Sequence, residues 1–234
     1  MSTTYRPEYL PATREIRDTF ADEIRLRGGM VSDVFDDGQR FIARAVLDAD
    51  TEIRRGDSVR AGVAVRAAAS EILVYPYIFR EVCSNGAIVA HALESRRLER
   101  TESTEVFLPT YDIAVTLTDL RDAIRACASG EVFATAADEM RSASETDADI
   151  ALHLLPALAR MPRHMVALVL PQIFQRFSTG GDRSAFGLLN AVTSVARDTR
   201  DPETRWSLEE LGGTMPARVG RRTVAGAVPY FAVT

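Results

Sequence analysis

The sequence has no lysine, because all 28 of its basic residues are arginine. It also has only 2 cysteines, 3 histidines and 1 tryptophan. No apolar run approaches the roughly 18 residues that a membrane-spanning helix needs. The first residues lack the charged segment and the following apolar segment of a secretion signal. We therefore expect a cytoplasmic protein that does not enter a membrane.

The scarce chemistry-bearing residues do not form recognisable catalytic patterns. Cys83 and Cys127 are far apart in a chain without an export signal, which favours reduced, buried thiols over a disulfide. His91, His153 and His164 are scattered, and none has a metal-ligand spacing with a cysteine or carboxylate. No serine lies in a nucleophile elbow, and no glycine pair is followed by the residues that hold nucleotide phosphates. We therefore predict a binding protein, with no enzyme activity, metal or cofactor.

Charge is unevenly distributed along the chain, whose formal net charge is −5. Residues 53–100 hold 8 arginines and 5 acidic residues, residues 101–150 hold 3 and 11, and residues 151–234 hold 10 and 6. Such segregation fits a groove for a polyanion or the self-association of basic and acidic surfaces. The alternative is an ordinary solvated surface with uneven charge.

Hydrophobic periodicity predicts an α+β fold. The spacing of Ile16, Phe20 and Ile24 predicts a helix over residues 13–27 that ends at two glycines. Apolar alternation then predicts a hairpin and further strands, and a helical period returns at residue 112. We expect an N-terminal helix, an antiparallel β-sheet of about four to five strands and a mostly helical C-terminal half. The expected strands cover residues 30–35, 41–47, 58–66 and 71–82.

These parts are expected to form one continuous domain. Residues 1–100 are the strand-rich part with its opening helix, residues 101–213 are the helical part packed on it, and residues 214–234 are a basic C-terminal tail. Pro76 predicts an edge position or a bulge in its strand. Ser84-Asn85-Gly86 predicts a tight turn, and Asp182 predicts the N-cap of a helix that runs to Arg197.

Two segments resemble a known protein family. The run Arg80-Glu81-Val82-Cys83-Ser84-Asn85-Gly86-Ala87 resembles the arginine, valine, cysteine, asparagine and glycine signature of domain-of-unknown-function family 932, which phages and plasmids carry. Residues 187–193 and 205–213 are similar to the C-terminal asparagine–threonine helix and closing glycine of that family. The resemblance covers roughly residues 56–213. It implies a phage-like or plasmid-like element and no established activity.

The expected layout is similar to that of single-strand annealing recombinases, in which a ring of subunits holds one strand along a basic groove. We therefore predict a homo-oligomer that binds single-stranded DNA. Such a site needs cations for phosphates and aromatic rings for bases. The candidate residues are Arg54, Arg55, Arg60, Arg66, Tyr75, Tyr77, Arg80, Asn85, Arg96 and Arg97.

Several of these candidates also have a structural interpretation. Arg80 and the following turn can hold a phosphate that Asn85 helps to read, or the turn can simply close a strand while Cys83 fills the core. Arg96 and Arg97 either extend the basic patch or belong to a solvated, charged helix.

A second hypothesis is an interaction protein or inhibitor of host defence that binds a host or phage protein rather than nucleic acid. Its binding surface would be the acidic segment of residues 101–150. A hydrolase or nuclease ranks last, because the spacing assembles neither clustered carboxylates nor a histidine base. Strand arginines that converge on one groove favour the nucleic-acid hypothesis, whereas arginines paired with local acids remove its main support.

Overall fold

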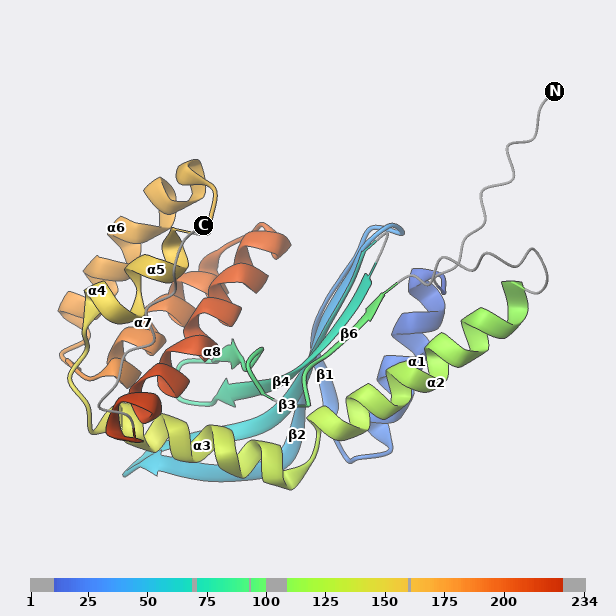
Figure 1. Cartoon of the computed structure of the whole chain (residues 1–234), viewed down its shortest axis with the longest axis horizontal. Helices are drawn as coiled ribbons and strands as arrows, with labels where there is room; N and C mark the ends of the chain where they lie inside the picture. The colour runs from blue at the N-terminus through green and yellow to red at the C-terminus, as the bar shows by residue number, and fades with distance from the viewer. Residues whose placement is uncertain (1–10, 69–70, 93, 100–108, 160, 225–234) are drawn as a thin grey trace. The chain divides into compact units, whose positions relative to one another are not determined.

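The computed structural model describes residues 11–68, 71–92, 94–99, 109–159 and 161–224 (Figure 1). It confirms the α+β fold class: an N-terminal helix, an antiparallel sheet and a helical C-terminal half. None of the described helices is long and apolar enough to cross a membrane. The elements are α1 (Thr13–Arg25), β1 (Met30–Asp36), β2 (Phe41–Arg54), β3 (Asp57–Ala68), β4 (Glu71–Arg80), β5 (Asn85–Ile88), β6 (Arg96–Glu99), α2 (Pro109–Cys127), α3 (Gly130–Ser144), α4 (Ile150–His153), α5 (Leu155–Leu158), α6 (Arg163–Thr179), α7 (Ala185–Asp198) and α8 (Pro202–Val224).

The chain forms two compact units built from interleaved segments. Unit 1 takes its described residues from Met1–Asp50, Arg60–Phe79 and Ala92–Phe133, and unit 2 takes its own from Thr51–Val59, Arg80–His91 and Ala134–Thr234. As a result, each of β2, β3 and β4 begins in one unit and ends in the other. Part of the predicted basic tail, residues 214–224, belongs to α8, and residues 225–234 lie outside the described residues.

The sheet has the strand order β1-β2-β3-β4-β5, and β6 also pairs with β4. The β1–β2 hairpin is antiparallel, with Asp36 opposite Phe41 and Met30 opposite Val46. Its turn contains Gly38 at a φ of 80°, a conformation that glycine adopts without steric cost. From Phe41 to Leu47 every residue of β2 is buried, so both faces of this strand are covered.

In unit 1, α1 packs against α2 and the sheet. Phe20 and Ile24 are almost fully buried, and the Phe20 ring meets Phe41 of β2 edge to face, with 6.4 Å between ring centres. The buried carboxylate of Glu23 lies 3.0 Å from a guanidinium nitrogen of Arg125 in α2. This pair ties the two helices together at a point where an unpaired carboxylate would be costly.

In unit 2, α7 is the central helix and contacts α6, α8 and β5 (Figure 1). Ten of its residues are buried, as expected for a helix that is covered on several sides. The backbone of α8 approaches β5 so closely at Gly213 that an added Cβ would lie 2.0 Å from the carbonyl oxygen of Ile88. Glycine is therefore required at this position.

Two predicted local features differ from the structure near the cysteine motif. Asn85 and Gly86 lie in β5, and the positive φ of the preceding turn belongs to Ser84, at 48°. Arg96 and Arg97 lie in β6, not in a helix, because the pairing of Leu98 opposite Ile72 provides a partner that the local charge pattern does not reveal.

Tertiary context corrects the predicted helix cap and the edge position of β4, and no described register tests the alternative of a bulge at Pro76. The N-cap of α7 is Ser184, whose hydroxyl accepts the N–H of Gly187; Asp182 instead accepts hydrogen bonds from Ser184. Strand β4 is not at the edge of the sheet, because β3 flanks it on one side and the short strands β5 and β6 also pair with it. Pairing with β6 ends at Val74, two residues before Pro76, so the proline lies outside that ladder.

Candidate functional site

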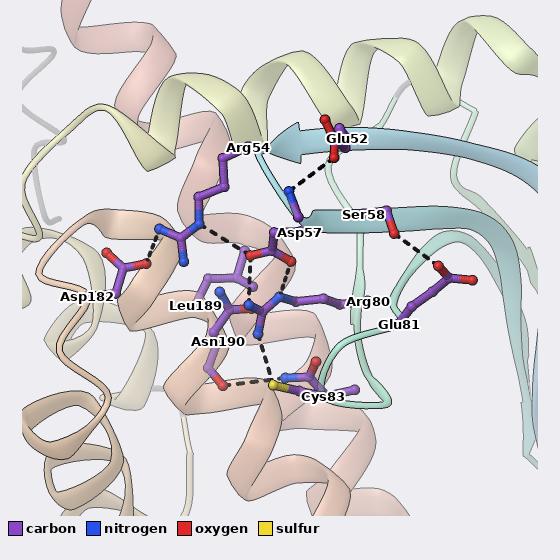
Figure 2. Close-up of polar contacts among 12 residues, drawn as sticks. Glu52, Arg54, Asp57, Ser58, Arg80, Glu81, Cys83, Asp182, Leu189 and Asn190 are labelled. Atoms are coloured by element: carbon purple, nitrogen blue, oxygen red, sulfur yellow. Dashed lines mark hydrogen bonds and ion pairs between the residues drawn. The ribbon is translucent and has the colours of Figure 1, made fainter.

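A pocket of 260 Å³ lies within unit 2. Its charged and nucleophilic lining consists of Arg54, Arg80, Arg176, Asp182 and Cys83, and we call it the arginine pocket. Figure 2 shows how the first of these arginines approaches Asp182 while the second points to Asp57 and Cys83. The two arginines lie at the ends of β2 and β4, Cys83 lies between β4 and β5, Arg176 lies in α6, and Asp182 lies between α6 and α7.

The turn between β2 and β3 holds two of these groups in place. The carboxylate of Glu52 accepts the backbone N–H of Gly56 at 3.0 Å, and Gly56 has a φ of 74° (Figure 2). This closes the turn and places Arg54 and Asp57 on the same side of it, with 3.3 Å between Nε and Oδ2. The predicted turn at Arg55-Gly56-Asp57 therefore positions Arg54 and the carboxylate of Asp57 at the pocket.

Arg80 forms a bidentate pair with Asp57. Its Nε and Nη2 donate to the two carboxylate oxygens at 2.6 and 2.7 Å, and its Nη1 donates to the sulfur of Cys83 at 3.1 Å. Burial disfavours the charged guanidinium, yet the pKa of Arg80 is raised because its bond and charge interaction with Asp57 outweigh that cost. Arg80 is therefore a fixed cation with its plane set by Asp57.

Arg54 links this pair to the start of α7. Its Nη1 lies 2.7 Å from Oδ2 of Asp182. Burial alone would raise the pKa of Asp182, but hydrogen bonds from Ser184 and the nearby Arg54 lower it below its ordinary value. Asp182 therefore stays ionised and anchors Arg54 beside the N-terminus of the helix.

Arg176 enters the pocket from α6. Its Nη1 donates to the hydroxyl of Ser194 at 2.6 Å, and its Nη2 lies 2.8 Å from Asp198. Asp198 also accepts from Arg197 at 2.9 Å, and Arg197 donates to the carbonyl oxygen of Cys83. The pKa of Asp198 is lowered by Arg197 and then by Arg176, so this carboxylate joins α6 and α7 as an anion.

These contacts do not use every donor and acceptor on the pocket wall. Nη2 of Arg54 and Nε of Arg176 take part in none of the hydrogen bonds and ion pairs described above. The side-chain oxygen of Asn190, which also lines the pocket, is buried and has no hydrogen-bond partner among the described residues. The two arginine nitrogens can therefore still donate to an anion.

The aromatic rings near the pocket are already occupied by cations. The guanidinium carbons of Arg54 and Arg80 lie 5.3 and 5.6 Å from the ring centre of Phe186, which is fully buried. Phe177 is 7% exposed and has Arg183 over its ring at 5.8 Å. Neither ring offers an open face on which a nucleobase can stack.

Four of the ten predicted residues lie in unit 2, where Arg54 and Arg80 line the pocket. Arg55 is exposed at the neighbouring turn. Asn85 is 3% exposed, and its amide nitrogen donates to the hydroxyl of Thr193 at 2.7 Å. Its side chain therefore fastens β5 to α7.

The other six predicted residues lie in unit 1, where three of the arginines pair with local acids. Arg60 lies 3.0 Å from Asp48, and both Arg66 and Arg97 lie 3.3 Å from Glu71. Arginines that pair with local acids do not form the basic groove that the nucleic-acid hypothesis expects along these strands. Each carboxylate would compete with a phosphate for the same guanidinium group.

The remaining candidates of unit 1 have three different environments. Tyr77 is 2% exposed and belongs to the core, so its ring cannot stack on a base. Tyr75 is half-buried. Arg96 is exposed and donates to the backbone carbonyl of Ser95 at 3.1 Å. Of the two predicted stacking residues, only Tyr75 retains an accessible surface.

Arg176, Asp182 and Asp198 were not predicted as site residues. Arg176 and Asp198 are 22 residues apart and meet only because α6 packs against α7. No local spacing in the sequence signals such a pair. The sequence predicts Asp182 only as a helix cap, and no local spacing predicts Arg54 as its partner.

Among the described residues, no three histidine, cysteine, aspartate or glutamate side chains gather in a way that can hold a metal ion. No protein-family model, curated protein or solved structure matches the chain. The resemblance to domain-of-unknown-function family 932 therefore stays a prediction.

Proposed function

We propose that the chain is a single-stranded DNA-binding protein whose arginine pocket holds a backbone phosphate. The observation that carries this proposal is the set of three arginines on one pocket wall, two of which keep a donor nitrogen outside their ion pairs. Guanidinium groups suit phosphate oxygens because their N–H groups are fixed in a planar fork. Phe177 and Phe186 are covered, so the pocket would contact phosphate and not base.

The segments that resemble family 932 also contribute to the arginine pocket. The run 80–87 supplies Arg80 and Cys83 to the pocket, and residues 187–193 supply Gly187, Asn190 and Ala191. Two segments about a hundred positions apart in the sequence therefore line one pocket. As part of the same proposal, the chain acts as a homo-oligomer, so that several pockets act on one strand and raise its affinity.

A second candidate function is an interaction protein that binds a basic protein partner. The pairing of Arg60, Arg66 and Arg97 with local acids favours it, because these arginines then offer no continuous cationic track. Exposed acidic residues follow α3 in unit 2, including Glu145 and Asp147. In this alternative the arginine pocket is a structural ion-pair network.

The test is fluorescence anisotropy of labelled single-stranded and duplex oligonucleotides across a salt series, with light scattering to measure the size of the assembly. Arg176→Gln removes one pocket cation while Asp198 keeps Arg197 as its partner. We expect roughly tenfold or more weaker binding and a salt slope lower by about one. The matched control is Arg163→Gln, which changes an exposed arginine at the start of the same helix.

Equal binding by Arg176→Gln and wild type would remove the pocket from the proposal. No binding by wild type at low salt would sink the nucleic-acid function and leave the protein-partner alternative. Binding that Arg176→Gln weakens and Arg163→Gln does not would support the pocket.

A further inference from the structure

We propose that Cys83 is a covalent modification site that reacts with small disulfides bearing carboxylate groups. Its sulfur accepts a hydrogen bond from Arg80 at 3.1 Å, and its carbonyl accepts one from Arg197. The side chain is half-buried and lines the arginine pocket, so a small reagent can reach it. Partly exposed cysteines in electropositive surroundings are those that react.

The second cysteine provides a contrast within the same molecule. Cys127 is 3% exposed and donates to the carbonyl oxygens of Val74 and Glu94. Burial raises the pKa of Cys127 to about 12, so it remains a thiol at neutral pH. Buried thiols of this kind are inert. Cys127 therefore serves as an internal control for the reactivity of Cys83.

The pocket selects the charge of the reagent. Arg54 Nη2 and Arg176 Nε take no part in the ion pairs described above, and both residues line the pocket with Cys83. A carboxylate of an incoming disulfide can therefore accept hydrogen bonds while its sulfur reaches Cys83. The volume of 260 Å³ lies below the range of about 300–1,000 Å³ typical of drug-sized ligands, which favours a small group.

The reaction is thiol–disulfide exchange. The thiolate sulfur of Cys83 attacks one sulfur of the small disulfide, a new S–S bond forms and the original S–S bond breaks. The leaving sulfur departs as a thiolate and takes up a proton. Cys83 is oxidised and the released half of the disulfide is reduced, so no other oxidant is required.

The first experiment measures alkylation of the folded and the urea-unfolded protein by iodoacetate and by iodoacetamide, with mass spectrometry of both cysteines. These reagents have similar sizes, but only iodoacetate is an anion. We expect the iodoacetate-to-iodoacetamide rate ratio at Cys83 to be roughly threefold or more higher in the folded protein, as one partly exposed ion pair would give. Arg176→Gln should lower that ratio, and Arg163→Gln should not.

The second experiment incubates the folded wild-type protein with the disulfide of mercaptoacetate, a small disulfide that bears two carboxylate groups, as the probe. A mixed disulfide on Cys83 with none on Cys127 is the expected result. Equal modification of both cysteines, or a Cys83 rate ratio identical in folded and unfolded protein, would overturn the proposal. The wild-type ratio stands even if a variant misfolds, and no oligonucleotide is present, so failure here is separate from failure of the nucleic-acid function.

Discussion

At the residue scale, the buried thiol of Cys127 couples stability to alkaline pH. Burial raises its pKa from 9.0 to about 12, so above pH 9 the unfolded chain loses this proton while the folded chain keeps it. The stabilisation is therefore complete below about pH 9 and is lost progressively up to about pH 12. The free energy of unfolding should fall by roughly 1.4 kcal/mol per pH unit in this range from this group alone.

Cys127→Ser should remove that contribution, because serine keeps a donor for the carbonyls of Val74 and Glu94 but does not titrate. Urea unfolding at pH 8, 9, 10 and 10.5 measures the difference in stability between variant and wild type. We expect this difference to shift in favour of the variant as the pH rises. Parallel curves would contradict the assignment.

At the element scale, the approach of α8 to β5 depends on Gly213. A Cβ at this position would lie 2.0 Å from the carbonyl oxygen of Ile88, which is backbone and cannot turn aside. Gly213→Ala should therefore lower the free energy of unfolding by roughly 1–3 kcal/mol despite the better helix propensity of alanine. The control is Gly130→Ala at the start of α3, where nothing lies within 4 Å.

Gly130→Ala should be neutral or stabilise by about 0.4–1 kcal/mol. Thermal and urea unfolding of both variants give the comparison. Similar stability of the Gly213 and Gly130 variants would show that α8 can withdraw from β5 at no cost.

The same helix shows where sequence patterns reach their limit. Periodicity predicted α1 and the first hairpin because their apolar spacing is local. In α8, Gly212, Gly213 and Pro216 are typical helix breakers, and the helix forms because two glycines allow it to approach Thr193 and Ile88. That reason becomes visible only in three dimensions.

The candidate site also combines features that the local sequence predicts with contacts that only tertiary packing shows. Arg80 and the turn that holds Asp57 are local features, and the sequence marked Arg80 as a phosphate ligand. The sequence does not predict the partners of the candidate arginines. Aspartate and glutamate are common surface residues, and no regular spacing links Asp182 to Arg54 or Glu71 to Arg66. The sequence gives the number of arginines but does not show which of them form ion pairs with carboxylates.

At the scale of the whole molecule, unit 1 and unit 2 share three strands of one continuous chain. Each of β2, β3 and β4 would lose part of its ladder if either unit unfolded, so we expect one cooperative transition. Trp206, the single tryptophan, is buried in unit 2 and reports by fluorescence. Cys127 reports on unit 1 by its reaction with a thiol reagent in pulse labelling.

Both probes should give the same urea midpoint, within the error of the fits. A Trp206 transition that precedes exposure of Cys127, or follows it, would mean that the units unfold separately. A variant with Trp206→Phe provides the control that the fluorescence change has a single origin.

The interleaving of the two units also constrains how this gene can have been assembled. Any recombination breakpoint between codons 51 and 133 divides both units at once, because segments of each alternate over that stretch. Neither unit is a portable module that shuffling can move intact to another gene. Sequence exchange with breakpoints between codons 51 and 133 should therefore be selected against.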